Sequence, residues 1–161
     1  MQFTTSSILA IVAYTTAVSA HGKLLDPPGI KHTGQPFGIT DIRVPAQGCG
    51  SGVAITGGAV ATFKAGSIGN ATWSVDNGDG AGPLLVAFDT TGKGTSFSAV
   101  AKMIENVGGQ NGGVANDFPR GPHDISFTVP DVKCTGCVMQ VRQNLSGGKE
   151  GFGSCAVVDI V

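Results

Sequence analysis

Short apolar runs, each bounded by Gly, Pro, Asn or Asp, follow one another along the C-terminal two thirds of the chain. Trp73 and Val75 alternate with polar neighbours, which is the period expected for a half-buried β-strand. The predicted strands cover residues 59–63, 71–75, 84–89, 97–103, 125–129, 138–144 and 156–161. Seven short strands within about 105 residues are typical of a β-sandwich. We therefore predict an all-β, immunoglobulin/fibronectin III-like sandwich of about seven strands with long N-terminal loops.

Three stretches depart from this pattern. Residues 21–54 are rich in Pro, Gly and polar side chains, which predicts irregular surface structure. Residues 108–113, Gly-Gly-Gln-Asn-Gly-Gly, predict a loop, and a phosphate cradle is not favoured because no Lys-Ser/Thr follows. Residues 97–107 also fit helical spacing, but a strand is the preferred prediction.

Pairing of two predicted strands would gather polar residues at one end of the domain. If residues 125–129 pair antiparallel with residues 138–144 across a turn at Cys134, His123 lies at the same end as the loop 144–152. That end is a candidate metal site. Asp79 lies in the turn between two other predicted strands, and the sequence does not fix its end. The alternative for Asp79, His123 and His32 is an ordinary exposed loop position.

The composition favours one compact domain. Of the 161 residues, 26 are Gly and only 13% are charged, which excludes a coiled coil or a disordered tail. The 10 Lys and Arg residues are balanced by 11 Asp and Glu residues, so there is no basic excess for nucleic-acid binding. The glycine content favours short strands and tight turns over long helices.

The first 20 residues are typical of a secretory signal peptide. An apolar run at residues 8–13 precedes the small residues Val-Ser-Ala, although no Lys or Arg lies ahead of the run. The run is too short to span a bilayer. We therefore expect a secreted, extracellular chain with a signal peptide at residues 1–20 and one sandwich domain at residues 21–161. Two sequons predict N-glycosylation, unless they match by chance, at Asn70 and Asn144.

Cleavage after Ala20 would make His21 the N-terminal residue. Its free amine and its imidazole Nδ1 would then occupy two cis positions around a metal ion that prefers a square or tetragonal set of nitrogen ligands. Cu(II) fits best, both by geometry and by its place in the divalent affinity series. The amine competes with a proton of pKa about 7.7–8.0, so binding weakens in acid. The alternative is a solvated His that follows the cleavage site by chance.

All four cysteines lie in the predicted mature chain, an even number for an oxidising compartment. Of the three pairings we favour Cys49–Cys155 and Cys134–Cys137, because the second pair lies in a Cys-Thr-Gly-Cys turn between two predicted strands. The long-range bridge would close a loop of about 105 residues and contribute about 4–5 kcal/mol in the chain-entropy model. A thioredoxin-type redox pair is disfavoured because no βαβ pattern surrounds the motif.

Three C-terminal motifs carry a resemblance to a known class of protein. They are Phe-Thr-Val-Pro at 127–130, Cys-Thr-Gly-Cys-Val at 134–138 and Gly-Phe-Gly-Ser-Cys-Ala-Val-Val-Asp-Ile at 151–160. This region resembles the end of fungal lytic polysaccharide monooxygenases, which place an aromatic residue, here Phe152, three positions before a Cys that opens the last strand. The resemblance implies the same scaffold and a copper-binding His21.

Two other segments are more specifically similar to the secreted appressorium-associated virulence factors of plant-pathogenic fungi, the Egh/Gas-like family. They are residues 75–83, Val-Asp-Asn-Gly-Asp-Gly-Ala-Gly-Pro, and residues 106–118. This likeness covers most of residues 21–161.

The sequence departs from the monooxygenase pattern at the second copper-binding histidine, where the matching residue is Asp79. The resemblance therefore leaves three options. Asp79 supplies an oxygen ligand, His123 replaces the lost imidazole, or His21 holds the metal alone. An oxygen ligand favours the oxidised ion over Cu(I). Phe152 would shield the axial position of the metal.

The preferred function is a secreted fungal protein that binds one copper ion through His21 and acts at the cell wall or host interface. The alternatives are a copper-dependent polysaccharide monooxygenase that oxidises a glycan, copper sequestration without turnover, and a metal-free apoplastic effector or wall-structural module. The expected partners are cell-wall polysaccharide or a host surface, with no nucleic acid, no membrane after signal cleavage and a monomeric chain. Trp73 is expected in the core and not on a glycan-stacking face.

Overall fold

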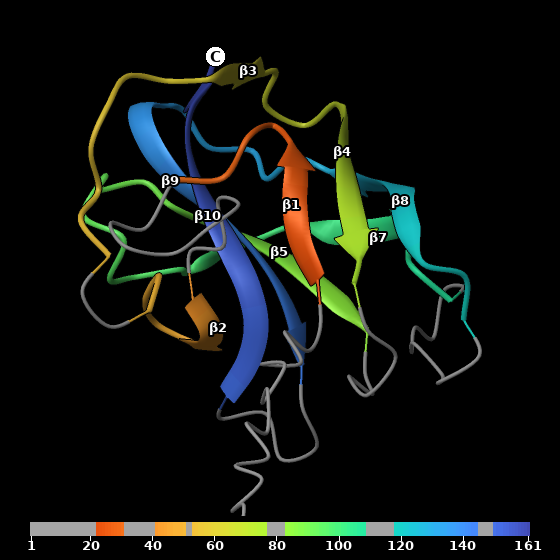
Figure 1. The fold of residues 1–161 in the computed structure, drawn as a ribbon. Coiled ribbons are helices and arrows are strands. Elements are labelled where there is room, and N and C mark those ends of the chain that lie inside the picture. Colours follow the sequence, from red (N-terminus) through yellow and green to blue (C-terminus); the bar gives the residue numbers. More distant parts are fainter. Residues whose placement is uncertain (1–21, 31–40, 51–52, 77–82, 109–117, 145–149) are drawn as a thin grey trace, which may run out of the picture.

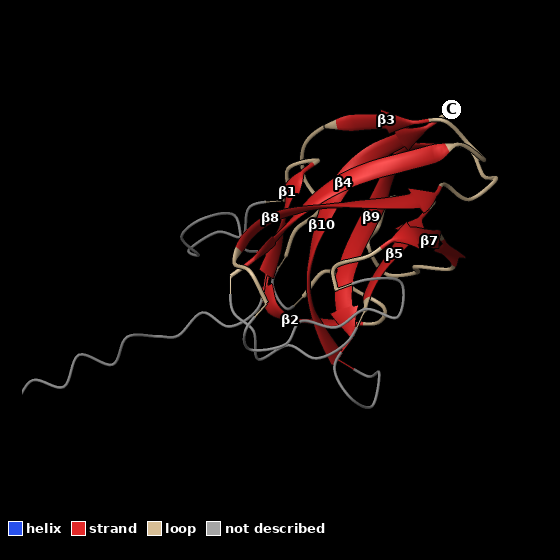
Figure 2. Cartoon of the chain, turned by 90° about the vertical axis from the view of Figure 1, so that its right-hand side faces the viewer, coloured by secondary structure: helices blue, strands red, loops and turns tan. Residues whose placement is uncertain are grey.

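The computed structural model describes residues 22–30, 41–50, 53–76, 83–108, 118–144 and 150–161. Within these ranges the regular secondary structure consists of strands, with no helix. The strands are β1 (Gly22–Asp26), β2 (Asp41–Pro45), β3 (Ala61–Phe63), β4 (Ile68–Val75), β5 (Leu84–Asp89), β6 (Ala99–Val100), β7 (Lys102–Glu105), β8 (Gly121–Thr128), β9 (Cys134–Asn144) and β10 (Glu150–Ile160). Figure 1 shows their arrangement, and Figure 2 shows it turned by 90°.

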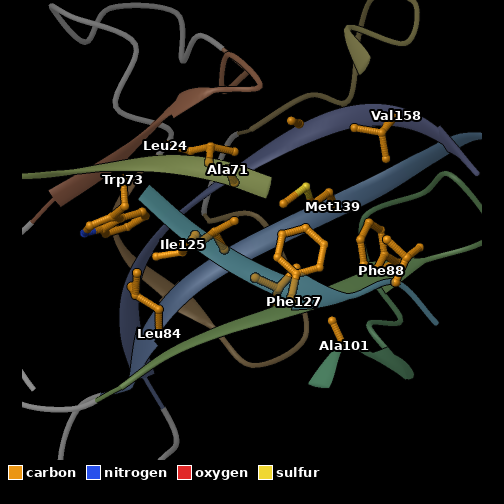
Figure 3. Packing of buried hydrophobic residues seen from close by; sticks show 14 of the residues in the cluster. Leu24, Ala71, Trp73, Leu84, Phe88, Ala101, Ile125, Phe127, Met139 and Val158 are labelled. Carbon is orange, nitrogen blue, oxygen red and sulfur yellow. The ribbon is translucent and has the colours of Figure 1, made fainter. Parts of the chain in front are cut away.

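Two sheets face each other across one core. The four-stranded sheet has the order β1-β4-β8-β7, and the six-stranded sheet has the order β2-β10-β9-β5-β6, with β3 pairing parallel to β10. Side chains from both sheets meet in this core in Figure 3, among them Leu24, Trp73, Ile125 and Phe127 from the first sheet and Leu84, Phe88 and Met139 from the second. The predicted all-β sandwich is confirmed.

Three phenylalanines from different strands join the two sheets at the core. The ring centroid of Phe63 lies 5.7 Å from that of Phe127 and 6.1 Å from that of Phe88, and the centroids of Phe88 and Phe127 are 6.3 Å apart. These distances are typical of tilted and edge-to-face aromatic contacts. Because the rings come from β3, β5 and β8, their contacts hold both sheets in one packing arrangement.

Each predicted strand overlaps an observed one, and the prediction at residues 84–89 coincides with β5. Residues 97–103 form two strands instead of one, because β6 pairs with β5 in the six-stranded sheet and β7 pairs with β8 in the other. The chain crosses between the sheets at Ala101, which is buried and donates its N–H to the Val86 carbonyl at 2.9 Å. The described ranges contain ten strands instead of seven, because of this crossing and of two further strands near the N-terminus.

The prediction of irregular structure at residues 21–54 is wrong in part, because β1 and β2 lie there. Among the described strands, β1 pairs only with β4 and β2 pairs only with β10, so both lie at the edges of their sheets there. Each has five residues, with few apolar positions. Such a strand is specified by its single neighbour and carries too short a pattern to be recognised in a Pro- and Gly-rich segment.

The predicted hairpin between residues 125–129 and 138–144 is wrong. β8 pairs with β4 and β7, whereas β9 pairs with β5 and β10, so the two strands lie in opposite sheets. After β8 the Val129 N–H donates to the Ser67 carbonyl at 2.8 Å, and the Val129 carbonyl accepts from the Gly66 N–H at 3.1 Å. The backbone groups of Val129 therefore pair with the turn before β4 and are not available for a hairpin with β9.

Both predicted disulfides are formed, Cys49–Cys155 and Cys134–Cys137. The prediction that the second pair lies in a turn between strands is wrong, because both cysteines lie at the beginning of β9. The Gly136 N–H there donates to Asp159 Oδ1 at 2.7 Å. Cys49–Cys155 fastens an N-terminal segment onto the outer face of the six-stranded sheet, where a second apolar cluster contains Cys49, Ala87, Phe97, Val138 and Cys155.

Asp89, the last residue of β5, organises the turn that follows it. One carboxylate oxygen accepts hydrogen bonds from the Thr91 N–H and hydroxyl at 2.8 and 2.6 Å, and the other accepts from the N–H groups of Thr95 and Ser96 at 2.8 and 3.1 Å. Burial raises the pKa of the Asp89 carboxyl, but the hydrogen bonds from Thr91, Thr95 and Ser96 outweigh it, so this pKa lies below its usual value.

Replacing Asp89 with Asn should lower the free energy of unfolding by about 2–4 kcal/mol at neutral pH, because an amide N–H₂ would face backbone donors. The folded-state pKa is depressed, so the stabilisation is present above the unfolded-state pKa and is lost as the pH falls through the folded-state value. Urea unfolding at decreasing pH should show the gap between wild type and Asp89→Asn closing in acid. The matched control is Asp131→Asn at an exposed position, and an equal loss in both variants would contradict the prediction.

Candidate functional site

A row of paired residues defines one end of the sandwich. Gly22, the first residue of β1, lies opposite Val75, the last residue of β4, and Val75 lies opposite Gly121, the first residue of β8. With neighbouring strands about 4.8 Å apart, the Cα atoms of Gly22 and Gly121 are about 10 Å apart. The chain therefore enters β1 and β8, and leaves β4, at the same end of the molecule.

The six-stranded sheet brings β10 and β9 to this end. The Leu24 N–H donates to Ser154 Oγ at 3.1 Å, which places β10 beside β1. Phe152, two residues earlier in β10, lies opposite Gln143 of β9. Phe152 is 5% exposed and Gln143 is 1% exposed. In Figure 1 the beginnings of β1 and β10 and the ends of β4 and β9 point toward the lower part of the picture.

Gly22 packs directly on Trp73. A side chain at Gly22 would overlap the indole Nε1 and the Ser74 carbonyl oxygen, so this position accepts only glycine. Trp73 is fully buried, as its alternation with Val75 predicts, and its Nε1 has no hydrogen-bond partner among the described residues. Gly22 is thereby held against the core, and it is the residue that directly follows His21 in the sequence.

Three polar side chains link the end of β4 to β1. Lys23 Nζ lies 3.2 Å from Asp76 Oδ2, and the Ser74 hydroxyl donates to Asp76 Oδ1 at 2.6 Å. Asp76 directly precedes residues 77–82, which contain Asp79. A partly exposed ion pair adds little stability, but this one places the start of that segment beside the strand that follows His21.

His123 lies on β8, opposite Trp73. Its Nε2 lies 2.9 Å from the Pro119 carbonyl oxygen, and its ring centroid lies 4.9 Å from that of Phe118. A carbonyl oxygen only accepts, so this contact assigns the proton to Nε2 and leaves the lone pair on Nδ1. In this arrangement His123 can bind a metal ion only through Nδ1.

The structure describes only some of the remaining predicted site residues. His21, His32 and Asp79 lie outside the described residues, Asn70 is exposed on β4, and Asn144 is the last residue of β9. Among the side chains that the structure describes, no group of three or more His, Cys, Asp and Glu could hold a metal ion. The predicted metal ligands His21 and Asp79 are not among these side chains, so the predicted metal site stays a prediction. The described part of the chain also has no helix long and apolar enough to cross a membrane.

Three residues that shape this region were not found from the sequence. Gln143 is buried on the same face of β9 as Met139 and Val141, so a polar side chain at an inward position was the available signal. Arg142 is 5% exposed on the opposite face of β9, and burial lowers the pKa of its guanidinium group. The need for Gly22 has no signal in the sequence, because it arises from Trp73, a residue far along the chain.

The fold defines a β-sandwich protein, an architecture that hosts many activities. Residues 11–145 match the Egh16-like virulence factor family, and the chain belongs to this family. The predicted family is thus confirmed. No curated protein sequence matches the chain.

Two solved structures are similar to the chain. One is an AA15 lytic polysaccharide monooxygenase from Thermobia domestica in the Cu(I) state, with 16% identity, 72% of this chain and 69% of that chain covered, and a TM-score of 0.48. The other is a neutron crystallographic structure of a Jonesia denitrificans lytic polysaccharide monooxygenase, with 16% identity, coverages of 88% and 100%, and a TM-score of 0.44.

Replacing Gly22 with Ala should destabilise the domain by about 1–3 kcal/mol, because the added methyl group displaces β1 from Trp73. Urea unfolding followed by circular dichroism measures the loss. Gly58→Ala is the matched control, since a methyl group there meets no atom within 4 Å. An unchanged midpoint in Gly22→Ala would show that β1 does not rest on the indole.

Proposed function

We propose that the protein is a secreted copper-binding protein that acts at the cell wall or host interface, with His21 as the central ligand. The observation that carries the proposal is the convergence of β1, β4, β8 and β10 at one end of the sandwich. These strands lead to His21, to the segment that contains Asp79, to His123 and to Phe152. Secretion is supported by the signal-like residues 1–20 and by two disulfides, which persist in oxidising compartments.

The donor atoms fit copper in type. Removal of residues 1–20 would leave the amine and imidazole of His21 one residue away from the contact between Gly22 and Trp73. That contact restricts the chain beside the chelating residue, so less conformational freedom is lost when a metal binds. Two cis nitrogen ligands suit Cu(II), which prefers square or tetragonal nitrogen fields.

Asp79 is the preferred third ligand. The segment that carries it leaves from Asp76, which Lys23 holds beside β1. His123 is the alternative, but the register puts its Cα atom about 12 Å from that of Gly22. Its Nε2 is also engaged by the Pro119 carbonyl oxygen. An oxygen ligand from Asp79 would favour the oxidised ion.

A copper-dependent polysaccharide monooxygenase is the second candidate function. The observation that favours it is the buried ring of Phe152 at the same end, which would shield one side of a metal from water. Copper bound there would supply one-electron chemistry with O₂ or H₂O₂ for hydrogen abstraction from a sugar C–H bond. Copper sequestration without turnover needs only the His21 chelate.

Copper titration tests the primary proposal, with Trp73 as an internal probe because it is the only tryptophan of the chain. A chain that begins at His21 should bind one Cu(II) at micromolar concentrations and lose Trp73 fluorescence through quenching by the nearby ion. Binding should weaken below neutral pH, as the amine takes up its proton. A chain with the four extra residues Gly-Ser-Gly-Ser ahead of His21 should bind far more weakly, because its amine is then too far along the chain to chelate copper together with the His21 imidazole.

Three variants of the His21-initiated chain assign the remaining ligands. Asp79→Ala should weaken binding and change the electron paramagnetic resonance spectrum of Cu(II), whereas His123→Gln should change it little. His32→Gln is the matched control for an imidazole elsewhere in the chain. Equal copper binding with and without the four extra N-terminal residues would overturn the proposal and leave a metal-free effector or wall-structural module.

Oxidative activity has a separate test. Copper-loaded protein with ascorbate should release oxidised oligosaccharides from chitin, glucan or pectin, detected by mass spectrometry, and Phe152→Ala should lower the yield by admitting water to the metal. The form with the four extra N-terminal residues is the control for free copper. If the copper-binding protein releases no oxidised product from any of these glycans, the monooxygenase assignment fails and sequestration remains.

A further inference from the structure

A cavity of about 160 Å³ lies on the outer face of the six-stranded sheet, away from the core. Its floor consists of two pairs of neighbouring residues on β5 and β9: Ala87 lies opposite Gln140, and Leu85 lies opposite Arg142. Phe97, Val100 and Gln47 are among the residues that wall it. The walls are therefore mostly apolar, with one cationic side chain.

Hydrogen bonds fix the walls of this cavity. The Gln140 amide nitrogen donates to the carbonyl oxygens of Pro45 and Gly48, at 3.1 and 2.5 Å, and so holds the segment 45–48 over the sheet. The Phe97 N–H donates to Gln47 Oε1 at 2.7 Å, which joins that segment to the opposite wall. The Cys49–Cys155 disulfide anchors the same segment to β10. The cavity is thus built by side chains of four separate parts of the chain.

Arg142 is the unusual member of the lining. It is 5% exposed, and its NH1 nitrogen has no hydrogen-bond partner among the described residues. Gly151 of β10 makes room for its stem. A Cβ atom there would lie 2.7 Å from Arg142 Cγ, and it would also overlap the Gln143 carbonyl oxygen. The described residues that line the cavity include no carboxylate, and a buried guanidinium group without an anion is costly.

We propose that this cavity binds a small monocarboxylate with a compact apolar body, whose carboxylate pairs with Arg142. Guanidinium and carboxylate groups match in shape and form two parallel hydrogen bonds. Leu85, Ala87, Phe97 and Val100 would contact the apolar body. An apolar cavity of about 150 Å³ holds a benzene ring, so benzoate is of suitable size. Burial lowers the pKa of the Arg142 guanidinium group, because little water solvates this cation.

The competing explanation is an internal partner. Asp41 lies opposite Gly153, and Gly153 lies opposite Arg142, so Asp41 is on the same row of the sheet, two strands away. If the Asp41 carboxylate neutralises Arg142, added carboxylate has no charge to pair with. The two explanations differ in whether the wild-type chain binds benzoate.

Titration of the full mature chain with benzoate at pH 7, where benzoate is ionised, tests the proposal by two-dimensional NMR. Benzoate should shift the backbone amide of Phe97 saturably, and benzamide, its neutral counterpart, should bind at least tenfold more weakly. Arg142→Met should remove the preference for benzoate. This variant should remain folded, since it replaces a buried cation with an apolar side chain of similar length, and its thermal unfolding midpoint verifies that.

Asp41→Asn separates the internal partner from an external ligand. Under the proposal, the wild-type chain binds benzoate and the variant binds it equally well or more tightly. Absence of saturable binding to the wild-type chain overturns the proposal, as does binding that appears only in Asp41→Asn. Equal affinity for benzoate and benzamide, or full retention of benzoate binding by folded Arg142→Met, also overturns it. None of these results depends on copper or on His21.

Discussion

The contact between the Gly22 backbone and the Trp73 indole determines where the first strand begins, and the arrangement of the candidate site follows from it. β1 is an edge strand with one neighbour, and the ends of such strands open readily. Packing on a fully buried ring opposes this opening and fixes the register of Gly22 with Val75. Because Val75 is also paired with Gly121, the same contact relates the start of β1 to the start of β8.

The pattern of apolar positions predicted most strands but not their partners. Alternation in residues 125–129 shows which side chains face a core, and it is equally compatible with either sheet. The choice was made by the backbone of Val129, which binds the turn before β4 and so directs the chain across to the other sheet. In the same way Ala101 ends one strand and begins another, because the adjacent residues pair with strands of different sheets. Such partners are distant in sequence, so local pattern cannot specify them.

Candidate ligands can be proposed from the sequence where the chemistry lies in single residues. A histidine that follows a signal-like segment suggests a chelate by itself, and Asp79 stands out by comparison with the monooxygenase pattern. Both assignments stay predictions, because His21 and Asp79 lie outside the described residues. The supporting residues depend on contacts across the fold. Gly22 is required by Trp73, and Gln143 acquires its burial from the sheet that covers it. Each of these roles arises from a contact between segments that are distant in the sequence, so the local sequence pattern does not indicate it.

β10 joins the two regions of interest because its side chains alternate between the faces of the sheet. Phe152 lies opposite the buried Gln143, and Ser154 accepts the Leu24 N–H from the other sheet, so both face inward. Gly151 and Gly153 face outward, where a Cβ atom at either position would overlap a backbone carbonyl oxygen of β9, and Gly151 also leaves room for the Arg142 stem. Glycine is a poor strand former, so these two positions lower the strand propensity of β10 in exchange for the close approach of the β9 backbone and the Arg142 stem.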